Sequence, residues 1–494
     1  MKLFFRLLAA MLLCLCIFLP ARAEETKLAE DISSAGLITE SAGIQTDRLF
    51  DGSQTRAAKA EEQSSLTLED PRGFGSLYLI FDREYGAYTL TNNDTGEIVT
   101  LGQLEFLHEW IPLEGSPKSV TLSFSSGAVK LNEIYAFTEG QVPEFVQKWE
   151  APREGETDLA LFSTHGDDEH LFFAGILPYY GVERGYQVQV VYLTNHRNLQ
   201  TPRCHEMLDG LWAVGIRTYP VFGEFKDYFS TSLRQAYGNF KYWGVTEEQL
   251  LSFVVEQVRR FKPKVAVCHD PVNGEYGHGA HMLYADLLMK TLEISDDPSQ
   301  FPESAEAYGT WDVPKTYLHC YGENKIVMDW DQPLDSFDGM TAYEVSTKLG
   351  FTCHKSQYND FAWYIAGMKT AAQIRKFGPW DFGLYRSTVG EDVQKNDFFE
   401  NLTTYAQDAR LRAEEEARRE AERLEEQRKA EEDARLAAEA EAEAARLAAE
   451  LALQEQARAE QARARRISVT VTAVLALLLV LILAAKFLSK GKKK

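Results

Sequence analysis

The sequence predicts an α/β domain with a mostly parallel sheet, preceded by a β-sandwich of the jelly-roll type and followed by a long helical stalk and one transmembrane helix. Two apolar runs, Asp158–Ser163 and Val265–Cys268, each end in a cluster of polar residues, as buried parallel strands do when their carboxyl ends carry a site. Between about residues 38 and 137, short alternating segments are separated by Gly, Asn, Asp and Pro turns, which is typical of antiparallel sandwiches. Residues 404–466 contain no Gly or Pro, and residues 467–485 are apolar and uncharged, which indicates a long helix ending in a membrane span.

The first 23 residues are expected to be a secretory signal peptide. Lys2 and Arg6 precede an apolar core, Leu7–Leu19, and Ala21-Arg22-Ala23 forms a small-x-small cleavage site. The chain is therefore expected to be exported.

Residues 28–142 are predicted to form the β-sandwich. Ser76–Phe81 and Val120–Phe124 show the alternation of half-buried strands. Leu49-Phe50-Asp51-Gly52 and the strand Leu131–Phe137 resemble discoidin-type, galactose-binding-like domains. The resemblance implies either a carbohydrate-binding module or a domain that only packs beside its neighbour, and the sequence leaves both interpretations open. The candidate sugar-stacking side chains are Tyr88 and Trp110.

The first polar cluster is Thr164-His165-Gly166-Asp167-Asp168-Glu169, directly after the first buried run. Taken alone, an acidic turn after a strand is most often a helix N-cap. A second cluster, Tyr276-Gly277-His278-Gly279-Ala280-His281, follows the other buried run. Because both runs are predicted strands of one parallel sheet, the two clusters are expected to lie at the same edge.

Together the two clusters supply what a metal site with an activated water needs. His165 and Asp168, three residues apart in one turn, can act as ligands, and His281 closes a three-ligand set that leaves a position for water. Asp167 and His278 remain as ionisable groups, one a candidate base and the other a candidate acid.

At these residues the chain resembles the LmbE-like, or PIG-L, family of metal-dependent N-acetylglucosaminyl deacetylases, whose hallmark is His-Pro-Asp-Asp-Glu with a later His-x-x-His. The resemblance lies within a predicted domain of residues 150–402 and implies a Rossmann-like fold. It also implies hydrolysis of the acetamide of an N-acetylated sugar, with Zn²⁺ or another divalent metal such as Fe²⁺ as cofactor. Carried over by position, the implied residues are His165, Asp168 and His281 as metal ligands, Asp167 as general base, His278 and Tyr276 as groups that stabilise or protonate the tetrahedral intermediate, and Arg203 as a substrate contact.

Two positions depart from the family pattern. Gly166 stands where the family has proline, so the turn is expected to gain backbone freedom without losing a ligand. Ala280 stands where the second motif often has aspartate, which removes a candidate hydrogen-bond partner for a ligating histidine. The five reactive positions are intact, so we expect an active site.

The C-terminal part is expected to anchor the protein. Residues 404–466, rich in Ala, Glu, Arg and Leu, are interpreted as a charged helical stalk or loose coiled coil, because the leucines keep no heptad. Self-association or partner binding through its Ala-rich faces stays an alternative. Residues 467–488 are predicted to span the membrane, and the basic tail, residues 489–494, indicates a cytoplasmic C-terminus with the body extracytoplasmic.

The formal net charge of −22 makes nucleic acid a poor partner. The expected substrate is an N-acetylated glycan or glycoconjugate. Two alternatives stay open: a catalytically inactive surface protein that binds glycan or acts as a scaffold, and a zinc amidase with a different substrate, because the motifs define the metal and the water but not the substrate pocket.

Overall fold

The computed structural model describes residues 27–195 and 201–490. The predicted signal peptide and the last four residues of the predicted basic tail lie outside these ranges. The chain divides into two units, Met1–Tyr405 and Ala406–Lys494.

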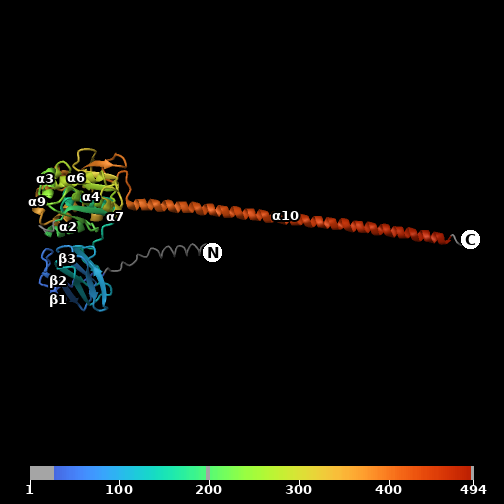
Figure 1. The fold of residues 1–494 in the computed structure, drawn as a ribbon, viewed down its shortest axis with the longest axis horizontal. Helices are drawn as coiled ribbons and strands as arrows, with labels where there is room; N and C mark the ends of the chain where they lie inside the picture. The colour runs from blue at the N-terminus through green and yellow to red at the C-terminus, as the bar shows by residue number, and fades with distance from the viewer. Residues whose placement is uncertain (1–26, 196–200, 491–494) are drawn as a thin grey trace, which may run out of the picture. The chain divides into compact units, whose positions relative to one another are not determined.

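The N-terminal part of the first unit is a sandwich of two antiparallel sheets (Figure 1, blue). One sheet has the order β1-β2-β7-β4-β5 and the other β6-β3-β8. Inward-facing Leu, Ile, Val and Phe side chains, such as Leu66, Leu79 and Val120, are fully buried between the sheets. The predicted sandwich is confirmed. Its strands are β1 (Ile38–Ile44), β2 (Ala60–Glu69), β3 (Ser76–Phe81), β4 (Tyr88–Asn92), β5 (Glu97–Leu101), β6 (His108–Pro112), β7 (Ser119–Phe124) and β8 (Leu131–Phe137).

The two candidate sugar-stacking aromatics of the sandwich differ in position. Tyr88 is 1% exposed and packs against Phe81 and Phe124, so it belongs to the core and cannot stack on a sugar. Trp110 is half-buried, and the Lys148 ammonium lies 4.3 Å from its ring centroid.

A seven-stranded sheet of order β11-β10-β9-β12-β13-β15-β14 follows the sandwich. The first five strands of this order are parallel. β15 runs antiparallel to β13, and the edge strand β14 runs antiparallel to β15 and therefore in the same direction as the first five. The chain starts in the middle at β9, moves outward to β11, and then returns to β12 on the other side of β9. This reversal makes the crevice between β9 and β12 a topological switch point, where open α/β sheets bind their ligands. The strands are β9 (Leu159–Ser163), β10 (Val188–Asn195), β11 (Val221–Lys226), β12 (Val265–Cys268), β13 (Lys315–His319), β14 (Lys325–Val327) and β15 (Asp381–Ser387).

Each face of this sheet has its own core. Along β9, Leu159 and Leu161 point to one face and Ala160 and Phe162 to the other, because side chains alternate along a strand. Both faces are covered, so the strands are apolar throughout. The α-helices of the domain are α2 (Thr201–Ala213), α3 (Leu233–Tyr242), α4 (Glu247–Phe261), α5 (Gly274–Gly277), α6 (Gly279–Leu292), α7 (Pro302–Tyr308), α8 (Ala342–Glu344) and α9 (Tyr358–Ile365). Shorter or π-helical turns are η1 (Ala35–Leu37), η2 (Asp168–His170), η3 (Leu177–Glu183), η4 (Asp335–Phe337), η5 (Val345–Gly350), η6 (Phe351–Cys353) and η7 (Ala371–Gln373).

Helix α4 shows how the sequence forms these elements. Thr246 and Gln249 make a reciprocal capping box at its start, which satisfies amide groups that the first turn leaves without partners. Leu250, Val254 and Val258, four residues apart, form a buried stripe on the sheet.

The sandwich and the α/β domain touch through buried side chains. Phe106 stacks on Tyr219 with ring centroids 4.3 Å apart. His108 Nε2 lies 2.8 Å from His205 Nδ1, and the Tyr78 hydroxyl lies 2.8 Å from His108 Nδ1. Both histidines are at most 1% exposed, so a hydrogen-bonded imidazole pair connects the two domains inside one compact unit.

The second unit is formed by helix α10 (Tyr405–Lys490), whose 86 residues correspond to about 130 Å (Figure 1, orange to red). It is one continuous helix, and its most apolar 18-residue window has a mean hydropathy of 2.9, so it is long and apolar enough to cross a membrane. In the charged part of the helix, Glu415 pairs with Arg419 one turn further on. Arg418 and Arg435 pair in the same way with Glu422 and Glu439. The predicted order of fold classes, β-sandwich, mostly parallel α/β domain and long helix, is confirmed.

Candidate metal centre

The site lies at the switch point of the parallel sheet. Thr164 and His165 follow the end of β9, and His269 follows the end of the neighbouring parallel strand β12. The Thr164 amide donates a hydrogen bond to His269 Nε2 at 2.9 Å, which ties the two strand ends together. The expectation that the two polar clusters share one sheet edge is therefore correct.

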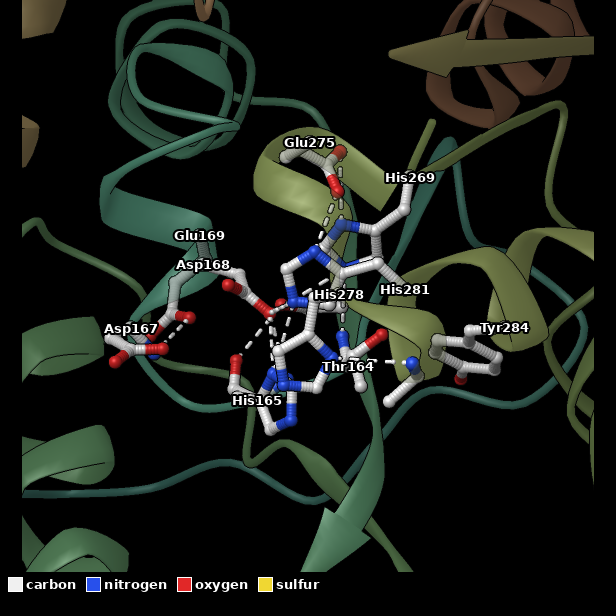
Figure 2. A network of polar contacts seen from close by, with 12 residues as sticks. Thr164, His165, Asp167, Asp168, Glu169, His269, Glu275, His278, His281 and Tyr284 are labelled. Atoms are coloured by element: carbon white, nitrogen blue, oxygen red, sulfur yellow. Dashed lines mark hydrogen bonds and ion pairs between the residues drawn. The ribbon is translucent and has the colours of Figure 1, made fainter. Parts of the chain in front are cut away.

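The three predicted ligands converge on one point (Figure 2). His165 Nδ1 lies 3.1 Å from both Asp168 Oδ2 and His281 Nε2, and the latter two atoms are 3.3 Å apart. Ligands about 2.0 Å from a tetrahedral ion stand about 3.3 Å from each other, so these separations suit a metal such as Zn²⁺. All three side chains are at least nine-tenths buried. Two imidazole nitrogens and a carboxylate oxygen gathered in this way fit a divalent cation.

Asp167 and Asp168, in the turn after β9, are held by different hydrogen bonds. Asp168 Oδ2 accepts a hydrogen bond from the His165 amide at 2.9 Å, which closes the turn around the ligand atoms. Asp167 has φ 154° and ψ −30°, a conformation that L-residues rarely adopt and that occurs preferentially at functional sites. Its amide donates to Glu169 Oε2 at 2.9 Å, which holds this unusual conformation.

Arg203, on α2, contacts the same turn. Its Nη2 lies 3.1 Å from Asp167 Oδ2 and 3.2 Å from the Gly166 carbonyl oxygen. Burial raises the pKa of Asp167 to about 7, against the lowering effect of Arg203 and with a further rise from the charge of Asp168. A carboxyl that titrates near neutral pH suits a general base. The described contacts of Arg203 thus position Asp167, and a direct contact with substrate stays a prediction.

His278 and Tyr276 stand beside the ligands. The His278 ring stacks on His281 with centroids 4.7 Å apart, and its Nδ1 accepts a hydrogen bond from the Ala280 amide at 3.2 Å. A neutral ring with Nδ1 as acceptor carries its proton on Nε2. Burial, together with the charges of His281 and His165, lowers the pKa of His278 to about 2. The Tyr276 ring is 38% exposed and lies 5.6 Å from His278, at the outer side of the site.

Glu275 is the main residue that sequence reasoning missed. Its carboxylate contacts three buried imidazoles: His281 Nδ1 at 2.5 Å, His319 Nδ1 at 2.8 Å and His269 Nδ1 at 3.2 Å. Burial alone would raise the pKa of Glu275, but the charges of His269 and His281 hold it well below its usual value. Glu275 orients the ligand His281, which is the role that aspartate at position 280 was expected to play.

Asp227 was also missed. Its Oδ1 lies 3.3 Å from His165 Nε2, so it holds the second ring nitrogen of that ligand. Burial lowers the pKa of His165, but the charges of Asp227 and Asp168 outweigh it and raise the pKa to about 10. Asp227 follows β11, His269 follows β12 and His319 ends β13, so position at the carboxyl end of a parallel strand was the signal that could have found them.

The glycine at position 166 is explained by packing. A Cβ added there would stand 2.7 Å from Met207 Cε and closer still to Met207 Cγ and Sδ. Met207, fully buried on α2, fills the space that a proline ring would need. A neighbouring side chain thus occupies the place of the missing ring, and the looser turn stays a prediction.

The fold and the site define a doubly wound α/β domain with a buried His/Asp metal centre. Residues 160–292 match the family model of PIG-L, described as GlcNAc-PI de-N-acetylase. The chain thus contains a PIG-L/LmbE deacetylase domain, which confirms the resemblance seen in the sequence.

Individual relatives are distant. A 1D-myo-inositol 2-acetamido-2-deoxy-alpha-D-glucopyranoside deacetylase of Geodermatophilus obscurus is 26% identical over 121 residues, 24% of this chain and 40% of that protein, so the match spans less than half of the relative's length. The structure of N,N'-diacetylchitobiose deacetylase from Pyrococcus horikoshii aligns with 15% identity over 47% of this chain and 83% of that chain, at a TM-score of 0.30. CpGH89CBM32-6 of Clostridium perfringens aligns with 20% identity over 24% of this chain and 97% of that chain, at a TM-score of 0.17.

Proposed function

We propose that this protein is a membrane-anchored, extracytoplasmic, zinc-dependent deacetylase that hydrolyses the acetamide of an N-acetylated sugar. The observation that carries the proposal is the convergence of His165 Nδ1, Asp168 Oδ2 and His281 Nε2 within 3.3 Å of one another, next to the buried Asp167 carboxyl. The family match over residues 160–292 supports the reaction type.

The residues have distinct roles in this proposal. His165, Asp168 and His281 would hold a divalent cation, which would supply Lewis acidity at the amide carbonyl and lower the pKa of a water molecule toward about 7. Asp167, held by Arg203, accepts the proton of the attacking water. The Nε2–H of His278 donates a hydrogen bond to the developing oxyanion or to the leaving amine, and the Tyr276 hydroxyl is a second donor.

Zinc is the metal we propose. His165 and His281 offer nitrogen and Asp168 oxygen, a three-ligand set that leaves a position for water, as in catalytic zinc sites. The same set also suits Fe²⁺, which is the alternative.

Exposed aromatic rings around the site support a sugar substrate. Phe229 is 72% exposed, with its ring centroid 5.9 Å from that of His278. Trp363 is 57% exposed and lies 6.4 Å from Tyr276. Aromatic faces of this kind stack on the apolar faces of sugar rings, and the relative from Geodermatophilus obscurus is named as a deacetylase of an acetamido sugar.

The location is proposed from the two ends of the chain. The signal-like residues 1–23 support export, and the apolar part of α10, residues 467–488, supports a single membrane span with a cytoplasmic basic tail. The predicted stalk, residues 404–466, which forms the charged part of α10 from Tyr405 on, then lies on the extracytoplasmic side.

The test measures zinc content and acetate release from N-acetylglucosamine oligomers with the purified chain. We expect about one catalytic zinc, and we expect Asp167→Asn to keep that zinc while losing at least a hundredfold in turnover. Asp209→Asn, a change of a half-buried carboxyl outside the site, should keep turnover. Absence of both zinc and acetate release would refute the proposal, and unchanged turnover in Asp167→Asn would remove Asp167 as the base.

A further inference from the structure

A second cluster of ligand-type side chains begins in η2, directly after the candidate ligand Asp168. It consists of Glu169, His170 and His354, all of which are fully buried. Glu169 Oε1 lies 3.5 Å from His170 Nε2 and 3.7 Å from His354 Nε2. The proposed function uses none of these three side chains.

The cluster contains polar atoms that lack hydrogen bonds. Among the residues that the structure describes, neither ring nitrogen of His170 has a hydrogen-bond partner. A buried polar group without a partner costs about 1–3 kcal/mol, so native proteins satisfy nearly all of them with protein, water or an ion. The separations of 3.5 and 3.7 Å are too long for direct hydrogen bonds but suit atoms that share a central partner.

Two glycines make room for these imidazoles. A Cβ at Gly210, on α2, would stand 2.8 Å from His170 Nε2 and 2.9 Å from His354 Nε2. A Cβ at Gly350, at the end of η5, would overlap the His170 ring. A glycine inside a helix costs roughly 1 kcal/mol relative to alanine, so Gly210 is explained by the close approach of the rings. The rings of His170 and His354, whose centroids lie 5.4 Å apart, thus occupy space that a Cβ at either glycine would fill.

We propose that Glu169, His170 and His354 bind a second, structural divalent cation of the zinc class. The donor set of two imidazole nitrogens and one carboxylate oxygen is typical of zinc. Glu169 Oε1 stands 3.5 and 3.7 Å from the two Nε2 atoms, a few tenths of an ångström beyond the tetrahedral edge of about 3.3 Å, which small side-chain movements close.

The second ion would stabilise the turn after β9, which carries Asp167, through Glu169. The other oxygen of this carboxylate, Oε2, accepts the hydrogen bond from the Asp167 amide. An ion bound to Oε1 therefore fixes the carboxylate that holds Asp167 in its rare backbone conformation. It also connects η2 to the segment after η6, which carries His354.

The experiment counts zinc in the purified full chain, after chelation and back-titration, by elemental mass spectrometry. We expect two zinc ions per chain in the wild type, and one in each of His281→Gln, His170→Gln and His354→Gln. The control variant His205→Gln changes a buried histidine on α2, outside both sites, and should keep two zinc ions. In the His281→Gln background, added zinc should still raise the melting temperature, and His354→Gln should abolish that rise.

Two results would overturn the second site. One is a wild-type chain that binds a single zinc ion, which is lost in His281→Gln. This result would mean that no ion binds at Glu169, His170 and His354. The other is retention of two ions in both His170→Gln and His354→Gln, which would place the second ion elsewhere. If a variant does not fold, the number of zinc ions in the wild type and in His281→Gln decides alone. A chain that binds one zinc, lost in His354→Gln but kept in His281→Gln, would support the structural site and contradict the catalytic one.

Discussion

Replacement of Gly166 by alanine tests whether Met207 has taken the place of the proline typical of this turn. The new Cβ would stand 2.7 Å from Met207 Cε and would overlap Cγ and Sδ, and all three atoms disappear in Met207→Ala. The φ of Gly166 lies outside the left-handed region, so alanine adds no backbone strain there. The whole effect of Gly166→Ala should therefore come from one steric clash.

The magnitudes follow from this geometry. Overpacking of a buried site costs about 1–3 kcal/mol, so Gly166→Ala should lower the free energy of unfolding by that amount. Met207→Ala alone should cost about 2–5 kcal/mol through lost burial and a cavity. In the Met207→Ala background, Gly166→Ala should cost nearly nothing, which gives a coupling energy of about 1–3 kcal/mol.

The assay is urea unfolding of the wild type, both single variants and the double variant, with zinc affinity as a second measurement. Gly238→Ala is the matched control: it lies on α3 with no atom within 4 Å of an added Cβ, so it should be neutral or slightly stabilising. An equal cost of Gly166→Ala with and without Met207 would refute the packing argument.

Three further outcomes are expected. Glu275→Gln should weaken zinc binding about 10 to 100-fold, because the candidate ligand His281 loses its charged partner. Glu133→Gln, which changes a buried carboxyl of the sandwich, should leave the zinc affinity unchanged. Equal affinities for wild type and Glu275→Gln would argue against the orienting role. Burial lowers the pKa of His205 from 6.5 to about 4, so the unfolded chain binds more protons than the folded chain between these pH values. The free energy of unfolding should therefore fall as the pH drops from 6.5 to 4, and denaturation at several pH values should show a shallower fall in His205→Gln. An identical pH dependence of the two chains would exclude this histidine as a cause. A chain of residues 1–466 should partition into the aqueous fraction while the full chain stays with membranes, and co-sedimentation of both with membranes would contradict the single-anchor proposal.

The order of domains could be predicted because each class has a strong local pattern. Val265–Cys268 is an apolar run that the structure shows as β12 with the same bounds, and the Gly- and Pro-free segment is one helix. The antiparallel edge strands β14 and β15 could not be predicted, since β14 has three residues and only one of them is buried. Its position depends on long-range pairing with β15, which no local pattern records.

The convergence of the candidate metal ligands could be predicted from their spacing and their strands, but the residues that contact them could not. Glu275 adopts φ 60°, and its role depends on three histidines that arrive from β12, α6 and β13. Met207 is similar, because its contact with position 166 arises from helix packing. Such partners are fixed by tertiary structure, whereas a motif is fixed by spacing along the chain.

The long sequence separation between the two halves of the metal centre bears on when the ion is acquired. His165 and His281 are 116 residues apart and meet only when β12 pairs beside β9. An extended chain in transit through a membrane therefore has no assembled centre that could carry an ion with it. On the proposed topology, the catalytic ion is taken up where the domain folds, and the metal supply of that compartment decides which cation the finished protein holds.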